Sequence, residues 1–221
     1  MRRADGLLEL AELACACLVV ALIGFSFYVD LARGFDVSLP DTMLLVLGAF
    51  LAHEFVHKAF ARGAGGGRFR MSITGSFYSL LVAGLMNAWW ALRSGFMALS
   101  GIRPLRMRQV VPFRLFTVGT VVLEERRSKE VVGRVALSGP TTNLLLGCAM
   151  LLAGLAGLEP EVLVVGASLN AYMALGSLLP LAFCDGLPIY WCSRKAWAAL
   201  LAASLLLIVM CSLAIYYVLP P

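Results

Sequence analysis

Long apolar stretches separated by short polar segments run along almost the whole chain. A helix needs about 20 mostly apolar residues to cross the roughly 30 Å hydrocarbon core of a bilayer. The pattern predicts helical segments at about residues 7–29, 41–62, 76–99, 135–158, 162–183 and 196–219. We therefore expect an all-α polytopic membrane protein with about five to six transmembrane helices.

Proline and glycine mark the breaks between these segments. Pro40 stands where the second helix should begin, because proline is tolerated in the first turn of a helix. The glycine-rich residues 63–67 should end that helix. Residues 110–123 are rich in Val, Phe and Thr, which predicts a small extended or strand segment, although Pro112 argues against a central strand position. The charged residues 124–130 are typical of a solvated loop.

The composition supports a membrane location. Of the 221 residues, 61% are hydrophobic and only 14% are charged, and the mean hydropathy is +0.88. A soluble domain cannot bury that much apolar surface. The net charge of +5 fits cytoplasmic loops facing anionic headgroups, so no nucleic-acid partner is expected. The six cysteines contain no CxxC pair and lie mostly in apolar segments, which argues against a disulfide framework or a zinc finger.

The distribution of charge predicts a topology. We place the N-terminus and residues 63–134 in the cytoplasm and assume that residues 76–99 make no net crossing. Arg33 is then the only basic residue clearly outside, in agreement with the positive-inside rule. This arrangement brings the end of the second helix and Asp185 to a similar depth near the cytoplasmic face. The sequence shows no repeat and no long linker, so residues 1–221 are expected to form a single domain.

The chemistry is concentrated in His53-Glu54-Phe55-Val56-His57, which contains the only two histidines of the chain. Four residues apart on a helix, the two imidazoles lie on one face, one turn apart. Neutral imidazoles at this spacing can bind one Zn²⁺ and leave room for a third protein ligand and a water. Glu54 is then placed to take a proton from that water. The alternative is a chance pentapeptide with buried core histidines, which is costly in an apolar helix.

Several carboxylates could supply the third ligand. Glu124, Glu125 and Glu130 lie in a basic segment that explains them as surface charge. Asp185 follows an apolar stretch, where an unpaired carboxylate is expensive. It could also be an ordinary aspartate at a helix end. The residue pattern favours Asp185 and leaves that alternative open.

Three motifs together resemble the site-2 protease family of intramembrane zinc metalloproteases. They are His53-Glu54-x-x-His57, then Gly139-Pro140-x-x-Asn143, then Leu178-Leu179-Pro180 followed by Asp185-Gly186. The resemblance covers roughly residues 41–190, and the chain has no room for additional regulatory domains. It implies that His53, His57 and Asp185 bind one Zn²⁺ and that Glu54 is the catalytic acid/base. It also implies that Asn143 lies near the site as a hydrogen-bond donor to the oxyanion or the substrate.

The expected function is hydrolysis of peptide bonds within or near transmembrane segments of membrane protein substrates. The expected location is the cell membrane, with the active site near the cytoplasmic face. Residues 110–123 could offer a strand edge to an unwound substrate peptide. Two alternatives stay open. One is a membrane zinc protease of the kind that trims prenylated tails, and the other is a non-catalytic membrane protein that binds metal.

Overall fold

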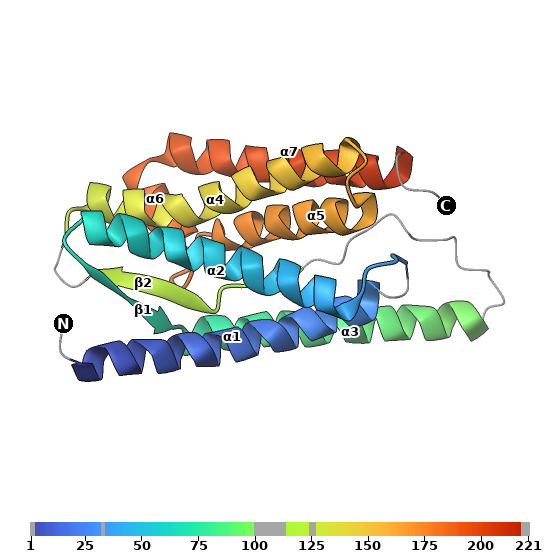
Figure 1. Ribbon diagram of the computed structural model, residues 1–221, viewed down its shortest axis with the longest axis horizontal. Coiled ribbons are helices and arrows are strands. Elements are labelled where there is room, and N and C mark those ends of the chain that lie inside the picture. The colour runs from blue at the N-terminus through green and yellow to red at the C-terminus, as the bar shows by residue number, and fades with distance from the viewer. Residues whose placement is uncertain (1–2, 32–33, 100–113, 124–126, 218–221) are drawn as a thin grey trace.

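The computed structural model of the chain describes residues 3–31, 34–99, 114–123 and 127–217 (Figure 1). Within these residues the fold is mostly helical, as the apolar pattern predicted, with one small pair of strands. The helices are α1 (Arg3–Leu31), α2 (Leu39–Gly63), α3 (Ile73–Leu99), α4 (Lys129–Leu155), α5 (Pro160–Ser177), α6 (Gly186–Cys192) and α7 (Arg194–Tyr217). The strands are β1 (Gly67–Met71) and β2 (Gly119–Leu123).

The long helices lie side by side, with α2 between two groups (Figure 1). On one side α2 packs against α1, which in turn packs against α3. On the other side it packs against α4 and α5, and α7 covers those two helices. Buried apolar side chains fill the spaces between them, including Phe27 of α1, Phe50 of α2 and Leu169 of α5. The histidine-bearing helix is therefore buried on the faces that meet these neighbours.

Four of the described helices are long and apolar enough to cross a membrane: α1, α2, α4 and α7. The sequence predicted about five to six such helices, and α3 and α5 are not among these four. Many large apolar side chains face outward from the bundle, including Leu18, Leu152 and Leu206, each more than 60% exposed. An apolar exterior of this kind suits a lipid environment better than water.

The start and end of α2 follow the local signals in the sequence. The Ser38 side chain accepts a hydrogen bond from the backbone N–H of Asp41, and Pro40 lies in the first turn. Both features stabilise a helix N-terminus. The helix ends at Gly63, and Gly65 and Gly66 follow with positive φ angles that favour glycine. The predicted second helix is confirmed to within two residues at its start and one at its end.

α4 begins earlier than predicted. The Ser128 side chain accepts a hydrogen bond from the backbone N–H of Val131 and so caps the helix at its N-terminus. Lys129 and Glu130 therefore belong to the first turn of α4, and the prediction of a loop was wrong for them. Residues 124–126, which include Glu124 and Glu125, lie outside the described part of the chain.

α5 ends at Ser177, six residues before the predicted end at residue 183. Proline has no backbone N–H to continue a helix, and Pro180 follows shortly after. Asp185 therefore does not stand at the end of a long helix. It lies in the turn between α5 and the short helix α6, which the sequence pattern did not predict.

β1 and β2 pair in antiparallel fashion, from Gly67 opposite Leu123 to Met71 opposite Gly119. Of the extended segment predicted at residues 110–123, only the last five residues form a strand. Residues 114–118 have no regular secondary structure, and residues 110–113, which include Pro112, lie outside the described part. The chain leaves the strand pair at Met71 and is back beside it at Gly119 (Figure 1). The segment between these two residues therefore begins and ends at the same place, while α3 itself is one unbroken helix of 27 residues. That residues 76–99 make no net crossing of a membrane stays a prediction.

Candidate metal centre

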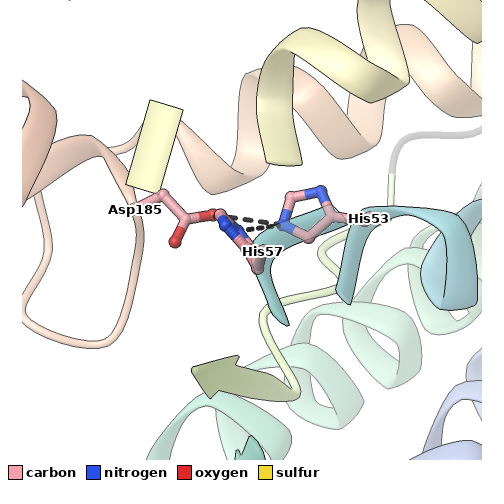
Figure 2. A group of neighbouring side chains, drawn as sticks. All are labelled: His53, His57 and Asp185. Carbon is pink, nitrogen blue, oxygen red and sulfur yellow. Dashed lines mark hydrogen bonds and ion pairs between the residues drawn. The ribbon is translucent and has the colours of Figure 1, made fainter. Parts of the chain in front are cut away.

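The two histidines lie on the inner face of α2, and their rings pack edge to face. His53 and His57 are 8% and 2% exposed. Their Nε2 atoms are 3.0 Å apart, because residues four apart on a helix stack one turn above another. Both Nε2 atoms point away from α2, towards the turn before α6 (Figure 2). The helix itself therefore places two nitrogen donors side by side.

Asp185 supplies the third donor at this point. Its Oδ2 atom lies 3.1 Å from His53 Nε2 and 3.2 Å from His57 Nε2 (Figure 2). Burial opposes ionisation of Asp185, but the facing imidazoles hold its pKa below its ordinary value. His53, His57 and Asp185 are the only three-residue group of possible metal ligands in the described ranges. Glu130, one of the competing carboxylates, is exposed in the first turn of α4.

The spacing of the three donor atoms fits a small divalent cation. Zn²⁺ binds nitrogen and oxygen ligands at about 2.0–2.2 Å in a tetrahedron, which places neighbouring donors roughly 3.3 Å apart. The observed separations of 3.0–3.2 Å are close to that value. Two imidazoles and one carboxylate, with one position open, are also a ligand set of catalytic zinc sites. The residues present therefore fit a zinc ion.

Gly139 of α4 leaves room for the two histidine rings. A Cβ atom at this position would lie 2.3 Å from His57 Nε2 and 2.5 Å from His53 Nε2. It would also lie 2.6 Å from His53 Cε1, and all three distances are far below ordinary non-bonded contacts. Any side chain at residue 139 would therefore enter the space beside both nitrogen donors.

α4 also contacts Nδ1, the second nitrogen of each histidine ring. His57 Nδ1 lies 2.7 Å from the backbone oxygen of Val135, to which an Nδ1–H can donate. The Ser138 hydroxyl donates to the same oxygen. Asn143 is completely buried, and its amide lies 3.1 Å from His53 Nδ1. The resemblance implied that Asn143 contacts the oxyanion or the substrate, whereas its contact in the structure is with His53.

Glu54 is buried beside the ligands and has a free carboxylate oxygen. The residue is 6% exposed, and its Oε2 atom has no hydrogen-bond partner within the described residues. Its other oxygen lies against β2, where a Cβ atom on Gly119 would be 3.1 Å from Oε1. Glu54 also lines a cavity of about 550 Å³ whose walls are mainly apolar side chains of α1 and α2, with Phe69 of β1. Glu54, which directly follows the ligand His53 in the sequence, thus borders this cavity.

A smaller cavity of about 110 Å³ lies on the side of His57 and Asp185. Its walls include three residues of β2: Thr120, Val121 and Leu123. Cys184 also lines it, and burial raises the pKa of its thiol to about 12. Its sulfur is not part of the group of donor atoms formed by His53, His57 and Asp185. All six cysteines are free, in agreement with the absence of a predicted disulfide framework.

The structure brings together every site residue that the sequence analysis selected: His53, Glu54, His57, Asn143 and Asp185. Sequence reasoning missed the Val135 carbonyl, because a backbone atom has no signature in the residue pattern. It named Gly139 only as part of a motif, without the steric reason for a glycine.

A comparison with models of known families, one with curated proteins and one with solved structures each gave no match. The function is therefore argued from the site itself.

Proposed function

We propose that this chain is an intramembrane zinc metalloprotease that hydrolyses peptide bonds within or near transmembrane segments of membrane proteins. The observation that carries the proposal is the meeting of His53, His57 and Asp185 around one point, with Glu54 buried and unpaired beside them. The three motifs that resemble the site-2 protease family are the ones whose residues meet there. That convergence supports membership of the family.

The membrane location rests on the four long apolar helices and the apolar exterior of the bundle. The histidine motif lies in the last third of α2, near the end that carries Arg62 and leads into the basic residues of β1. By the positive-inside rule that end faces the cytoplasm. The active site accordingly lies near the cytoplasmic face of the cell membrane.

The metal would be held by His53 Nε2, His57 Nε2 and Asp185 Oδ2. Bound there, Zn²⁺ supplies Lewis acidity, which polarises a substrate carbonyl and makes a water molecule more acidic. The negative charge of Asp185 offsets part of the charge of the cation in surroundings of low dielectric constant.

Glu54 acts as the general base and then as the general acid. Its carboxylate accepts a proton from the attacking water and passes it to the leaving amine. An unpaired buried polar atom costs about 1–3 kcal/mol, more when it is charged. A cost of this kind, carried by a carboxylate that is not itself among the metal ligands, is expected where the group must remain available for catalysis.

Two features support a peptide as the substrate. The mainly apolar cavity at Glu54 suits the side chains of a transmembrane segment. On the other side, β2 uses one edge to pair with β1, and its residues line the cavity that contains His57 and Asp185. An unwound substrate segment could add to β2 as a further strand through backbone hydrogen bonds.

Metal analysis and a cleavage assay on the same purified protein test the proposal. The wild-type protein should contain about one zinc per chain and should cleave a model transmembrane substrate in detergent or liposomes. Glu54→Gln should keep the zinc and lose at least about a hundredfold in cleavage rate, since general acid–base catalysis contributes about 10²–10⁴-fold.

Glu130→Gln, at an exposed carboxylate remote from the ligands, is the matched control and should behave as wild type. Zinc without cleavage of any transmembrane substrate would favour the non-catalytic alternative. Cleavage restricted to prenylated tails would favour the tail-trimming alternative. If Glu54→Gln loses zinc and activity in parallel, the division of roles proposed for the motif is wrong.

A further inference from the structure

We infer that Asn143 is a positioning residue of the metal centre, which accepts a hydrogen bond from His53 Nδ1–H and so directs His53 Nε2 to the metal. The inference deepens the proposed function and rests on its metal site. It assigns Asn143 a contact with a ligand in place of the contact with the oxyanion or substrate.

The chemistry of a metal-binding imidazole requires such an acceptor. A neutral imidazole has one protonated nitrogen and one with a free lone pair. When Nε2 gives its lone pair to a metal, the proton must be on Nδ1, and a buried Nδ1–H needs an oxygen to receive it. His57 has this oxygen in the Val135 carbonyl, 2.7 Å away. His53 has Asn143 in the corresponding place, 3.1 Å away.

The helix geometry explains why these two residues contact the two rings. Val135, Gly139 and Asn143 are spaced four residues apart, so they form one stripe along α4. The stripe runs alongside His57 and His53, which are four residues apart on α2. Val135 meets His57, Asn143 meets His53, and Gly139 lies between them next to both Nε2 atoms. One helix thus contacts the Nδ1 atoms of both histidines and leaves room for both rings.

His53 is the only hydrogen-bond partner of the Asn143 amide within the described ranges. The amide nitrogen is placed next to His53 Nδ1, and the amide oxygen has no hydrogen-bond partner in the described ranges. Turning the amide by 180° exchanges its nitrogen and oxygen at nearly unchanged positions. With Nε2 on a metal, only the orientation with the oxygen towards Nδ1–H forms a hydrogen bond.

The burial of Asn143 argues against direct contact with substrate. Its exposed fraction is 0%, and it lines neither of the two cavities next to the site. It contacts Nδ1, whereas the donor atom that faces His57 and Asp185 is Nε2. An amide on that side of the ring acts through His53.

Zinc affinity tests the inference, because it does not depend on catalysis. Purified variants are stripped of metal, and their Kd for Zn²⁺ is measured by competition with a chelating dye. Asn143→Leu keeps the size of the side chain but removes the acceptor, and it should weaken zinc binding about 10–100-fold, as loss of an outer partner of a metal-binding histidine typically does. Asn143→Asp supplies a carboxylate oxygen as acceptor and should restore binding to within a few-fold of wild type.

Asn170→Leu is the matched control for packing damage. Asn170 is a fully buried asparagine of α5 whose amide donates to the Gly166 backbone oxygen within its own helix. This variant should bind zinc as wild type does. If Asn143→Leu binds zinc normally and loses only cleavage, Asn143 serves the oxyanion or the substrate, and the inference is overturned.

Failure of Asn143→Asp to bind better than Asn143→Leu would also overturn the inference, since the required group would then not be an acceptor. A wild-type protein that binds no zinc would overturn the inference together with the proposed metal centre. Zinc affinities in the predicted order, with wild type and Asn143→Asp binding more tightly than Asn143→Leu, would leave the inference standing even if the protein cleaves no peptide. The proteolytic function would then be refuted.

Discussion

At Gly139 the missing side chain leaves room for the two imidazole rings of the candidate metal centre. A Cβ atom there would meet both Nε2 atoms at 2.3–2.5 Å, so both rings would have to move, and their Nδ1 contacts with Val135 and Asn143 of the same helix would be disturbed. The motif Gly139-Pro140-x-x-Asn143 thus combines two tasks on one helix face. Its glycine leaves room, and its asparagine orients a ligand.

Gly139→Ala should therefore abolish zinc binding, although alanine is the better helix former. Zinc per chain, measured on purified protein, should fall close to zero while the helical circular dichroism signal is retained. Gly48→Ala in α2 is the control, because a Cβ atom at Gly48 would meet nothing within 4 Å. A Gly139→Ala protein with a full complement of zinc would show that the ion lies elsewhere.

The assignment of Asp185 can be tested at the same scale. Asp185→Asn exchanges a carboxylate for a neutral amide, a poorer ligand for a dication, and should weaken zinc binding strongly. Asp185→Glu should retain part of the metal but misplace it, so that activity falls further than occupancy. Glu130→Gln should leave the zinc content unchanged, as measured by metal analysis. Zinc that survives Asp185→Asn would refute the third ligand.

The sequence predicted the site residues unevenly. The pairing of His53 and His57 follows from helix geometry alone and needs no tertiary information. Asp185 is 128 residues from His57, and three weaker signals pointed to it: the cost of an unpaired carboxylate after an apolar stretch, its predicted depth and the family resemblance. The partner of Asn143 could not be predicted, because it depends on how α4 is rotated against α2. That rotation is set by packing, which the residue pattern does not encode.

At the scale of elements, two glutamates explain how β1 is held without a third strand. Glu9 and Glu12 interrupt the apolar run of α1. The Glu9 carboxylate accepts a hydrogen bond from the backbone N–H of Phe69 at 3.0 Å and also pairs with Lys58. The Glu12 carboxylate accepts from the N–H of Met71 at 2.9 Å. The backbone N–H groups of Phe69 and Met71, on the edge of β1 that faces α1, thus have side-chain acceptors in place of a third strand.

Glu9→Ala should destabilise the protein by about 1–3 kcal/mol, because it leaves a buried N–H and a lysine without their acceptor. Glu9→Gln retains a neutral acceptor and should cost less. The unfolding temperature in detergent gives the ranking. Glu159→Ala is the control, at an exposed glutamate whose side chain makes no capping hydrogen bond. Equal stability of Glu9→Ala and wild type would mean that β1 does not depend on α1.

The predicted elements were most accurate where length and composition decide, as in α1, α2 and α7. They failed where one local contact decides. The Ser128 cap starts α4 six residues before its predicted start, and α5 ends well before its predicted end, shortly ahead of Pro180. The five residues of β1 gave no strand signal, since two of them are arginines and its partner β2 is almost 50 residues further along.

At the scale of the whole molecule, the pairing of β1 with β2 brings together the two ends of the segment that contains α3. Residues 67 and 123 are paired neighbours, so the chain reaches α4 from the same end of the bundle at which it left α2. α2 and α4 can then both cross the membrane with their site residues at the same level, which a lone full crossing in between would prevent.

Cysteine labelling in intact cells tests this topology. In a protein freed of its six native cysteines, Arg70→Cys and Lys129→Cys should both react only from the cytoplasmic side. Glu159→Cys, in the connection between α4 and α5, should react from outside. Each position is exposed in the structure. Labelling of residues 70 and 129 from opposite sides would contradict the fold and would separate Asp185 from the histidines.

The wide separation of the metal donors along the chain also has a consequence for synthesis. His57 leaves the ribosome 128 residues before Asp185, and α4, which orients both imidazoles, is made in between. A nascent chain that has inserted only its first helices has two donors and no complete site. The proposed protease is therefore inert while it is inserted next to other newly made membrane proteins. It gains activity only when its own later helices have docked.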